Sequence, residues 1–139
     1  MKFQRPKILT YQDTIRFHGH NGPFLALGYK LGKHINSKHR PEGIMGLNII
    51  VKVKPEKPFT CLIDGLQCST FATMGKGNMT AKISRGKAIT VSVVAGKKKY
   101  TYYITQQAMD ICLGAEDLDK AARKIFRTPF GQLFNLSLP

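Results

Sequence analysis

The chain has 139 residues, of which 42% are hydrophobic and 22% are charged. This length and composition are typical of one compact domain over residues 1–139, and they exclude low-complexity, collagen-like and coiled-coil proteins. No stretch approaches the ~20 continuous apolar residues of a membrane span. Residues 1–6 lack the apolar run of a signal peptide, and three cysteines are too few for a disulfide framework, so we expect a cytoplasmic protein.

Charge is the abnormal quantity in the composition. Lys and Arg number 22 against 8 Asp and Glu, which gives a formal net charge of +14. Such an imbalance predicts attraction to polyanions or to an acidic partner. The basic residues are spread along the chain without a basic tail. A solvated basic surface is therefore the alternative to a dedicated binding face.

Helical patterns come first along the chain. Thr10 is a possible cap for a helix that begins beside it. Pro23 suits the first turn of a second helix, whose apolar residues recur at helical spacing as far as Ile35. Gly28 and Gly32 lie one turn apart in that helix. Each costs ~1 kcal/mol relative to Ala, so we expect another backbone to approach closely there.

The period changes to two within residues 46–54, which predicts a half-buried strand. Further strands are predicted at residues 79–84, 88–94 and 100–105, the last two joined as a hairpin through residues 95–99. Helices follow at residues 106–112 and 115–126, and Pro129 ends the second. The apolar end, residues 130–139, is expected to dock on its own core or on a neighbouring subunit. Helices before and after a block of strands predict an α+β fold with a mostly antiparallel sheet packed against N-terminal and C-terminal helices.

Two histidines stand close together where one predicted helix ends and the next begins. His18 and His20 are two residues apart. In extended backbone, positions i and i+2 point to the same side, so both imidazoles could reach one metal ion. A lone His-x-His pattern is also common in ordinary turns, and that interpretation stays open.

A second unusual segment, residues 61–78, is dense in small and polar residues. A helix that begins at Cys61 would place Cys61 and Asp64 on one face. A Cys61 thiolate would complete a three-ligand set with the two imidazoles, leaving a fourth position for water or substrate as in catalytic zinc sites. The alternative is that cysteines here are small buried residues. That interpretation also suits Cys68, and Cys112 is predicted to lie in the core.

The turn at residues 75–78 contains Lys76 between two glycines. It fails the P-loop pattern, because Gly77 follows the lysine where Ser or Thr belongs. Its backbone N–H groups could still hold an anion with Lys76 as the counter-charge. A tight turn before a strand explains the glycines equally well.

Together, the two segments resemble the E-subunit family of formylmethanofuran dehydrogenase. The resemblance rests on Phe17-His18-Gly19-His20, Pro23, Leu25-Ala26-Leu27-Gly28-Tyr29, Cys61, Asp64-Gly65-Leu66-Gln67, Thr73 and Gly75-Lys76-Gly77-Asn78. It implies an α+β core domain, often dimeric, with a metal-capable His/Cys cluster. We therefore expect a homodimer.

The chain departs from that family at three places. Members often have a cysteine where this chain has Gly22, and many have another where it has Ala72. Larger members also resemble the core plus a C-terminal zinc finger, and no Cys-x-x-Cys exists here. These departures weaken a thiolate-rich or redox site and leave His18, His20 and Cys61 as the retained ligands.

A metal-binding, enzyme-like domain is the first functional hypothesis. Zinc is the expected ion at His18, His20 and Cys61, and a metal-bound water of lowered pKa would support hydrolysis or hydration. In this hypothesis Asp64 orients a ligand or acts as an acid/base. Substrate or an anion would be bound by Thr73, Lys76 and Asn78.

Two other hypotheses use the positive charge instead. In one, the protein is a basic accessory subunit with a vestigial cleft that docks an acidic protein or a redox complex. In the other it binds nucleic acid through Tyr100, Tyr102 and Tyr103, which follow the basic residues 97–99. A strand alternates its faces, so Tyr103 points away from the other two, and known RNA-binding signatures are absent. Nucleic acid is therefore not favoured.

Overall fold

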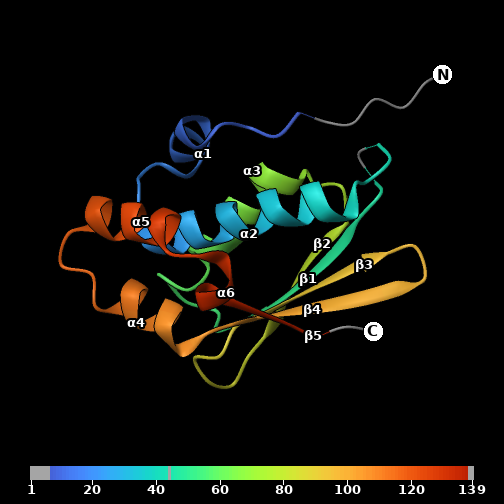
Figure 1. Ribbon diagram of the computed structural model, residues 1–139. Coiled ribbons are helices and arrows are strands. Elements are labelled where there is room, and N and C mark those ends of the chain that lie inside the picture. Colours follow the sequence, from blue (N-terminus) through green and yellow to red (C-terminus); the bar gives the residue numbers. More distant parts are fainter. Residues whose placement is uncertain (1–6, 44, 138–139) are drawn as a thin grey trace.

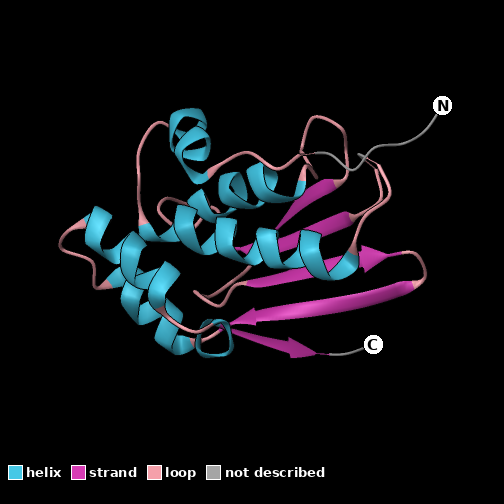
Figure 2. Cartoon of the chain, turned by 45° about the horizontal axis from the view of Figure 1, so that its top comes forward, coloured by secondary structure: helices cyan, strands magenta, loops and turns pink. Residues whose placement is uncertain are grey.

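The computed structural model describes residues 7–43 and 45–137 of the chain. Figures 1 and 2 show the sheet with helices α2 and α3 lying over one face. The helices of the described residues are α1 (Tyr11–His18), α2 (Pro23–His39), α3 (Cys61–Thr70), α4 (Gln106–Leu113), α5 (Leu118–Arg127) and α6 (Phe130–Leu133). The strands are β1 (Asn48–Val53), β2 (Met79–Ile83), β3 (Thr90–Ala95), β4 (Lys98–Ile104) and β5 (Phe134–Ser137). This arrangement confirms the predicted α+β class.

The first two helices begin where the sequence predicts. The Thr10 side chain accepts a hydrogen bond from the Asp13 N–H, which satisfies one of the open donors at the start of α1. Pro23 occupies the first turn of α2, where no N–H is needed. Between them, Gly19 ends α1 in the left-handed region at φ 106°. The chain thus turns sharply within the segment that holds His18 and His20.

The sheet is mixed, with strand order β2-β1-β3-β4-β5. Three neighbouring pairs are antiparallel, as predicted for most of the sheet, and β1 pairs with β2 in parallel. A parallel pair requires a crossover between its strands, and α3 supplies it. The segment singled out in the sequence at residue 61 is therefore the crossover helix of a β-α-β unit.

The C-terminal half follows the predicted order with shifted boundaries. The β3–β4 hairpin is tighter than expected, because Ala95 pairs with Lys98 and leaves a two-residue turn with Gly96 at φ 62°. Helix α5 begins three residues later than predicted, since the Asp117 side chain caps it through the Lys120 N–H. The apolar end docks on its own core as α6 and β5, and β5 pairs with β4. Residues 138–139, which belong to that prediction, lie outside the described residues, as do the residues 1–6 examined for a signal peptide.

Glycines bring the backbones of α2 and α3 into direct contact. A Cβ on Gly28 of α2 would collide with the carbonyl oxygen of Leu62, and a Cβ on Gly65 of α3 would collide with that of Leu25. At Gly32, a Cβ would instead collide with the side-chain oxygen of Ser69. The close approach of another backbone is therefore confirmed at Gly28, and its partner is α3, whereas α3 meets Gly32 through side chains.

The two faces of the sheet differ in character. Ile49, Val51 and Val53 of β1 are buried in the core together with α2. On β4, Tyr102 is fully buried and Tyr103 is 46% exposed, which confirms the predicted alternation. Within the described residues, none of the helices combines the length and apolar character needed to cross a membrane.

Candidate metal centre

His18, His20 and Cys61 come from two separate segments of the chain, with α2 and β1 between them. His18 is the last residue of α1, His20 follows the Gly19 turn, and Cys61 is the first residue of α3. The two histidines meet through a glycine turn rather than through the extended segment expected from their spacing. Their ring centroids are 4.7 Å apart. The contact between α2 and α3 brings the start of α3 beside this turn.

The potential ligand atoms of these residues form a compact cluster. One nitrogen from each histidine and the Cys61 sulfur all lie within 4.8 Å of one another. Two imidazole nitrogens with one thiolate is a donor set that proteins use for zinc, and three protein ligands leave a further position open. The predicted trio could therefore hold a metal ion.

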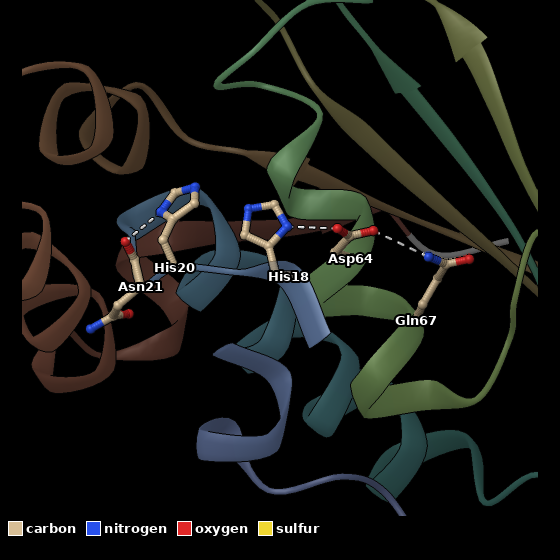
Figure 3. Close-up of polar contacts among 5 residues, drawn as sticks. All are labelled: His18, His20, Asn21, Asp64 and Gln67. Atoms are coloured by element: carbon tan, nitrogen blue, oxygen red, sulfur yellow. Dashed lines mark hydrogen bonds and ion pairs between the residues drawn. The ribbon is translucent and has the colours of Figure 1, made fainter. Parts of the chain in front are cut away.

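The His18 ring is oriented by Asp64 (Figure 3). Its Nδ1 lies 2.6 Å from the Asp64 Oδ2 atom. A carboxylate accepts hydrogen bonds, so Nδ1 carries the proton and Nε2 of the neutral ring keeps its lone pair. That Nε2 atom is buried and has no hydrogen-bond partner among the residues that the structure describes. A metal-ligating histidine has this arrangement, with its second nitrogen bonded to a carboxylate.

The His20 ring is oriented by the backbone. Its Nδ1 lies 2.8 Å from the carbonyl oxygen of Asn21, so the N–H is donated there and Nε2 is left free to act as a ligand. The Asn21 side chain accepts a hydrogen bond from the Tyr11 hydroxyl and donates one to Asp119. Burial, with a smaller contribution from Asp119, raises the pKa of Tyr11 to about 12, so this hydroxyl keeps its proton. Helices α1 and α5 thus fix the turn that carries His20.

Cys61 is half-buried beside the two rings. Burial raises the pKa of its thiol, and the negative charge of Asp64 raises it further. Without a cation, the sulfur therefore holds its proton at neutral pH. A divalent metal deprotonates a coordinating thiol outright, so metal binding at this position would release a proton.

A hydrogen-bonded chain extends from the cluster to the loop after α3. Gln67 donates from Nε2 to Asp64 Oδ1 at 3.3 Å, and its Oε1 accepts from the Met74 N–H at 2.8 Å. Figure 3 shows Asp64 between His18 and Gln67. Gln67 belongs to the family motif, but sequence reasoning did not assign it a role. Its position three residues after Asp64 on a helix was the available signal.

A cleft of about 400 Å³ opens over the cluster. It is lined by His18, His20, Lys57, Thr60, Cys61, Ile63, Asp64, Gln67 and Met74. Lys57 and Thr60 were not singled out in the sequence, because they precede the helix in a proline-containing segment without a motif. The cleft therefore combines the three potential ligands with a carboxylate, an amide and an ammonium group.

The structure places Thr73, Lys76 and Asn78 in the loop between α3 and β2, and the cleft lining takes only Met74 from that loop. The Lys76 ammonium group donates to the Phe71 carbonyl and, at 3.1 Å, to the Thr73 hydroxyl. Asn78 is buried, where its Oδ1 accepts from the Thr73 N–H and its Nδ2 donates to the Leu47 carbonyl. Their hydrogen bonds hold the loop together. Binding of an anion there stays a prediction.

The other two cysteines lie in the core, as predicted. Cys68 is 4% exposed and Cys112 is 5% exposed. Burial raises the pKa of Cys112 to about 12, so its thiol is inert at neutral pH. Cys61 is the only one of the three that joins the ligand cluster found among the described residues.

A known protein family matches the part of the chain that contains this cluster. Residues 17–135 match the family described as FmdE, Molybdenum formylmethanofuran dehydrogenase operon. The match takes in the whole ligand cluster and extends from the end of α1 into β5. None of the curated proteins matches the chain. Because the match covers most of the sequence, the resemblance seen in the motifs is confirmed, and the chain belongs to the FmdE family.

Proposed function

We propose that this protein is a metal-binding, enzyme-like domain that holds zinc at His18, His20 and Cys61. The observation that carries the proposal is the buried Nε2 atom of His18, which has no hydrogen-bond partner in the described part of the chain. A buried polar atom without a partner is costly, whereas a ligated one is satisfied. With Nδ1 bonded to Asp64, this atom lies on the side of the ring that faces His20 (Figure 3).

The surrounding residues have separate tasks in this proposal. Asp64 accepts the Nδ1 proton of His18 and holds the ring, and Gln67 holds Asp64. A bound divalent cation supplies Lewis acidity and lowers the pKa of a water at its open position. The cleft admits a small molecule to that position, and Lys57 on its wall would attract a negatively charged one. Hydrolysis or hydration is the reaction class that this equipment suits.

Metal analysis of untagged protein tests the proposal. We expect one zinc ion per chain by X-ray fluorescence, and none in Cys61→Ala. The matched control is Cys68→Ala, which removes a buried thiol outside the cluster and should keep the metal. Absence of stoichiometric metal from the wild type after reconstitution with zinc, nickel or iron would refute the proposal, as would its retention in Cys61→Ala.

A second candidate function is docking of an acidic partner, and one surface favours it. Four basic residues on one face of α5 are exposed and line a hollow of about 710 Å³: Lys120, Arg123, Lys124 and Arg127. Like charges spaced three and four residues apart on a helix repel one another. An acidic protein segment in the hollow would relieve that repulsion.

Charge reversal tests the docking function separately from metal binding. We expect Lys124→Glu/Arg127→Glu to weaken binding of a polyglutamate peptide about tenfold or more, because two attractive charges become repulsive. The same reversal at Lys97 and Lys98 in the β3–β4 hairpin is the control, since it changes net charge equally. If both variants lost the same affinity for polyglutamate, binding would depend on net charge and not on the α5 face. The homodimer and the nucleic-acid alternative stay predictions.

A further inference from the structure

A second, smaller cavity adjoins the metal centre on its inner side. It has a volume of about 80 Å³ and an almost entirely apolar wall, lined by His20, Gly22, Pro23, Phe24, Leu25, Pro58, Cys61, Cys112 and Leu118. His20 and Cys61 also line the outer cleft. These two potential ligands therefore stand between a wide cleft that contains the polar groups of Asp64, Gln67 and Lys57 and a narrow cavity that is almost entirely apolar.

The wall of this cavity selects against polar occupants. Phe24, Leu25 and Cys112 are at most 5% exposed, and Cys112 keeps its thiol protonated because burial raises its pKa to about 12. A water molecule needs two to four polar partners, and apolar cavities stay dry. A cavity of about 150 Å³ with such a wall holds a benzene ring, so one of half that volume holds about three carbon atoms.

We propose that the metal centre takes a small ligand with a metal-binding head group and an apolar tail of about three carbon atoms, and that the tail enters this cavity. The inference rests on the proposed metal site, because His20 and Cys61 hold the head group's metal at the cavity mouth. Any polar remainder of the ligand faces Asp64, Gln67 and Lys57 in the outer cleft. The specificity of the centre thus lies in tail length and polarity.

Alkanethiols bound to cobalt-loaded protein test the proposal without an assay of activity. Co(II) replaces zinc and reports both its own binding and that of a thiolate through its visible absorption. We expect the Kd to fall about fourfold from ethanethiol to propanethiol, which differ by one carbon, and to fall no further for butanethiol and hexanethiol. Propanethiol should bind about tenfold more tightly than 2-mercaptoethanol, which has the same length but would bury a hydroxyl group without a partner.

Two leucines provide a matched pair of variants. Leu118 lines the cavity and is 48% exposed, whereas Leu113 is 43% exposed and is not part of the lining. Leu118→Trp should block the cavity and abolish the preference for propanethiol over 2-mercaptoethanol. Leu113→Trp should keep that preference. Because both side chains are partly exposed, neither substitution disrupts the core.

The outcomes separate this inference from the proposed function. Cobalt bands that respond to every thiol with the same Kd would overturn the inference and leave the metal site standing. A length preference that survives in Leu118→Trp would also overturn it, because the tail would then lie elsewhere. Failure of the wild type to bind Co(II) would refute the metal site itself, and the inference with it.

Discussion

The turn between α1 and α2 and the loop between α3 and β2 both contain residues that the sequence predicts to bind a ligand. In the fold, the two segments use their polar groups differently. In the turn, the His18 Nε2 atom is buried without a hydrogen-bond partner among the described residues, and the His18 ring belongs to the cluster of three potential ligands. In the loop, the Lys76 ammonium group binds the Phe71 carbonyl and the Thr73 hydroxyl, and Asn78 bridges Thr73 and Leu47. One segment keeps a donor atom available for a ligand, and the other uses its polar groups to hold its own shape.

A polar atom without a hydrogen-bond partner is therefore a better indicator of a binding site than the type of residue that carries it. Histidine, lysine and asparagine all suggest chemistry when they appear in a polar, glycine-rich segment. Buried polar groups must nevertheless be satisfied, and a short loop with few other partners satisfies them internally. Substitutions in the two segments should accordingly affect different quantities, namely metal affinity in the turn and stability in the loop.

Replacement of His18 should give the largest effect. We expect His18→Ala to weaken zinc binding roughly a hundredfold or more, because structural zinc sites gain about 10–16 kcal/mol from four ligands together. The apo-protein loses only the Nδ1 hydrogen bond to Asp64, so its free energy of unfolding should fall by about 1 kcal/mol. His34→Ala is the matched control: His34 stacks on Phe130, so its removal should lower stability and leave zinc affinity unchanged. Chelator competition and urea denaturation measure the two quantities.

Asn78 should show the opposite behaviour. Asn78→Ala leaves the Thr73 N–H and the Leu47 carbonyl without their partner, which should lower the free energy of unfolding by about 2 kcal/mol. The folded variant should still bind one zinc ion. Thr80→Ala, an exposed change two residues away, should leave the free energy of unfolding within about 0.5 kcal/mol of wild type. Loss of zinc from folded Asn78→Ala would place the loop within the site.

Replacement of Asp64 tests whether its carboxylate orients the His18 ring for metal binding. We expect Asp64→Asn to weaken zinc binding about tenfold to a hundredfold, the usual cost of losing the partner that orients a metal-ligating histidine. Asp110→Asn, on the exposed face of α4, should have no effect on zinc. Isothermal titration with zinc measures both variants. Unchanged affinity in Asp64→Asn would leave acid/base work as the remaining role for this carboxylate.

Lys76 should give the smallest effect of the four. Lys76→Met removes two hydrogen bonds from a charged group and should lower the free energy of unfolding by about 1–2 kcal/mol. Lys82→Met, on the exposed part of β2, should have no measurable effect. Inorganic phosphate should shift the Tm of all three proteins equally. If phosphate stabilised the wild type and Lys82→Met but not Lys76→Met, the prediction that this loop binds an anion would be supported.

The helices and the interior strand β1 could be predicted because their signals are local. Thr10 and Pro23 mark helix starts, and the alternation in β1 marks a strand with one buried face. The short strand β5 and the parallel pairing of β2 were not predicted, since both depend on partners far away in the sequence. Helix α5 begins later than the predicted residue 115 because the Asp117 side chain caps it.

For the site, the ligand types could be predicted but their surroundings could not. His18, His20 and Cys61 stand out by chemistry and spacing. The Gln67 link to Met74 and the anchoring of Asn21 by Tyr11 and Asp119 are tertiary contacts across as many as 98 positions. Single-sequence patterns contain no information on such contacts. The apolar cavity likewise exists only where α2, α4 and α5 meet.

The contact between α2 and α3 also bears on the spacing of the potential ligands. Cys61 begins one of these helices, and His20 lies three residues before the other. Backbone atoms meet at Gly28 and Gly65, so no rotamer change can widen the gap between them. The spacing between His20 and Cys61 therefore depends on the absence of two methyl groups in the contact between α2 and α3, and in the proposed zinc site it would set the ionic radius that fits. Under the proposed function, a change of the preferred ion would therefore involve these glycines as well as the ligands.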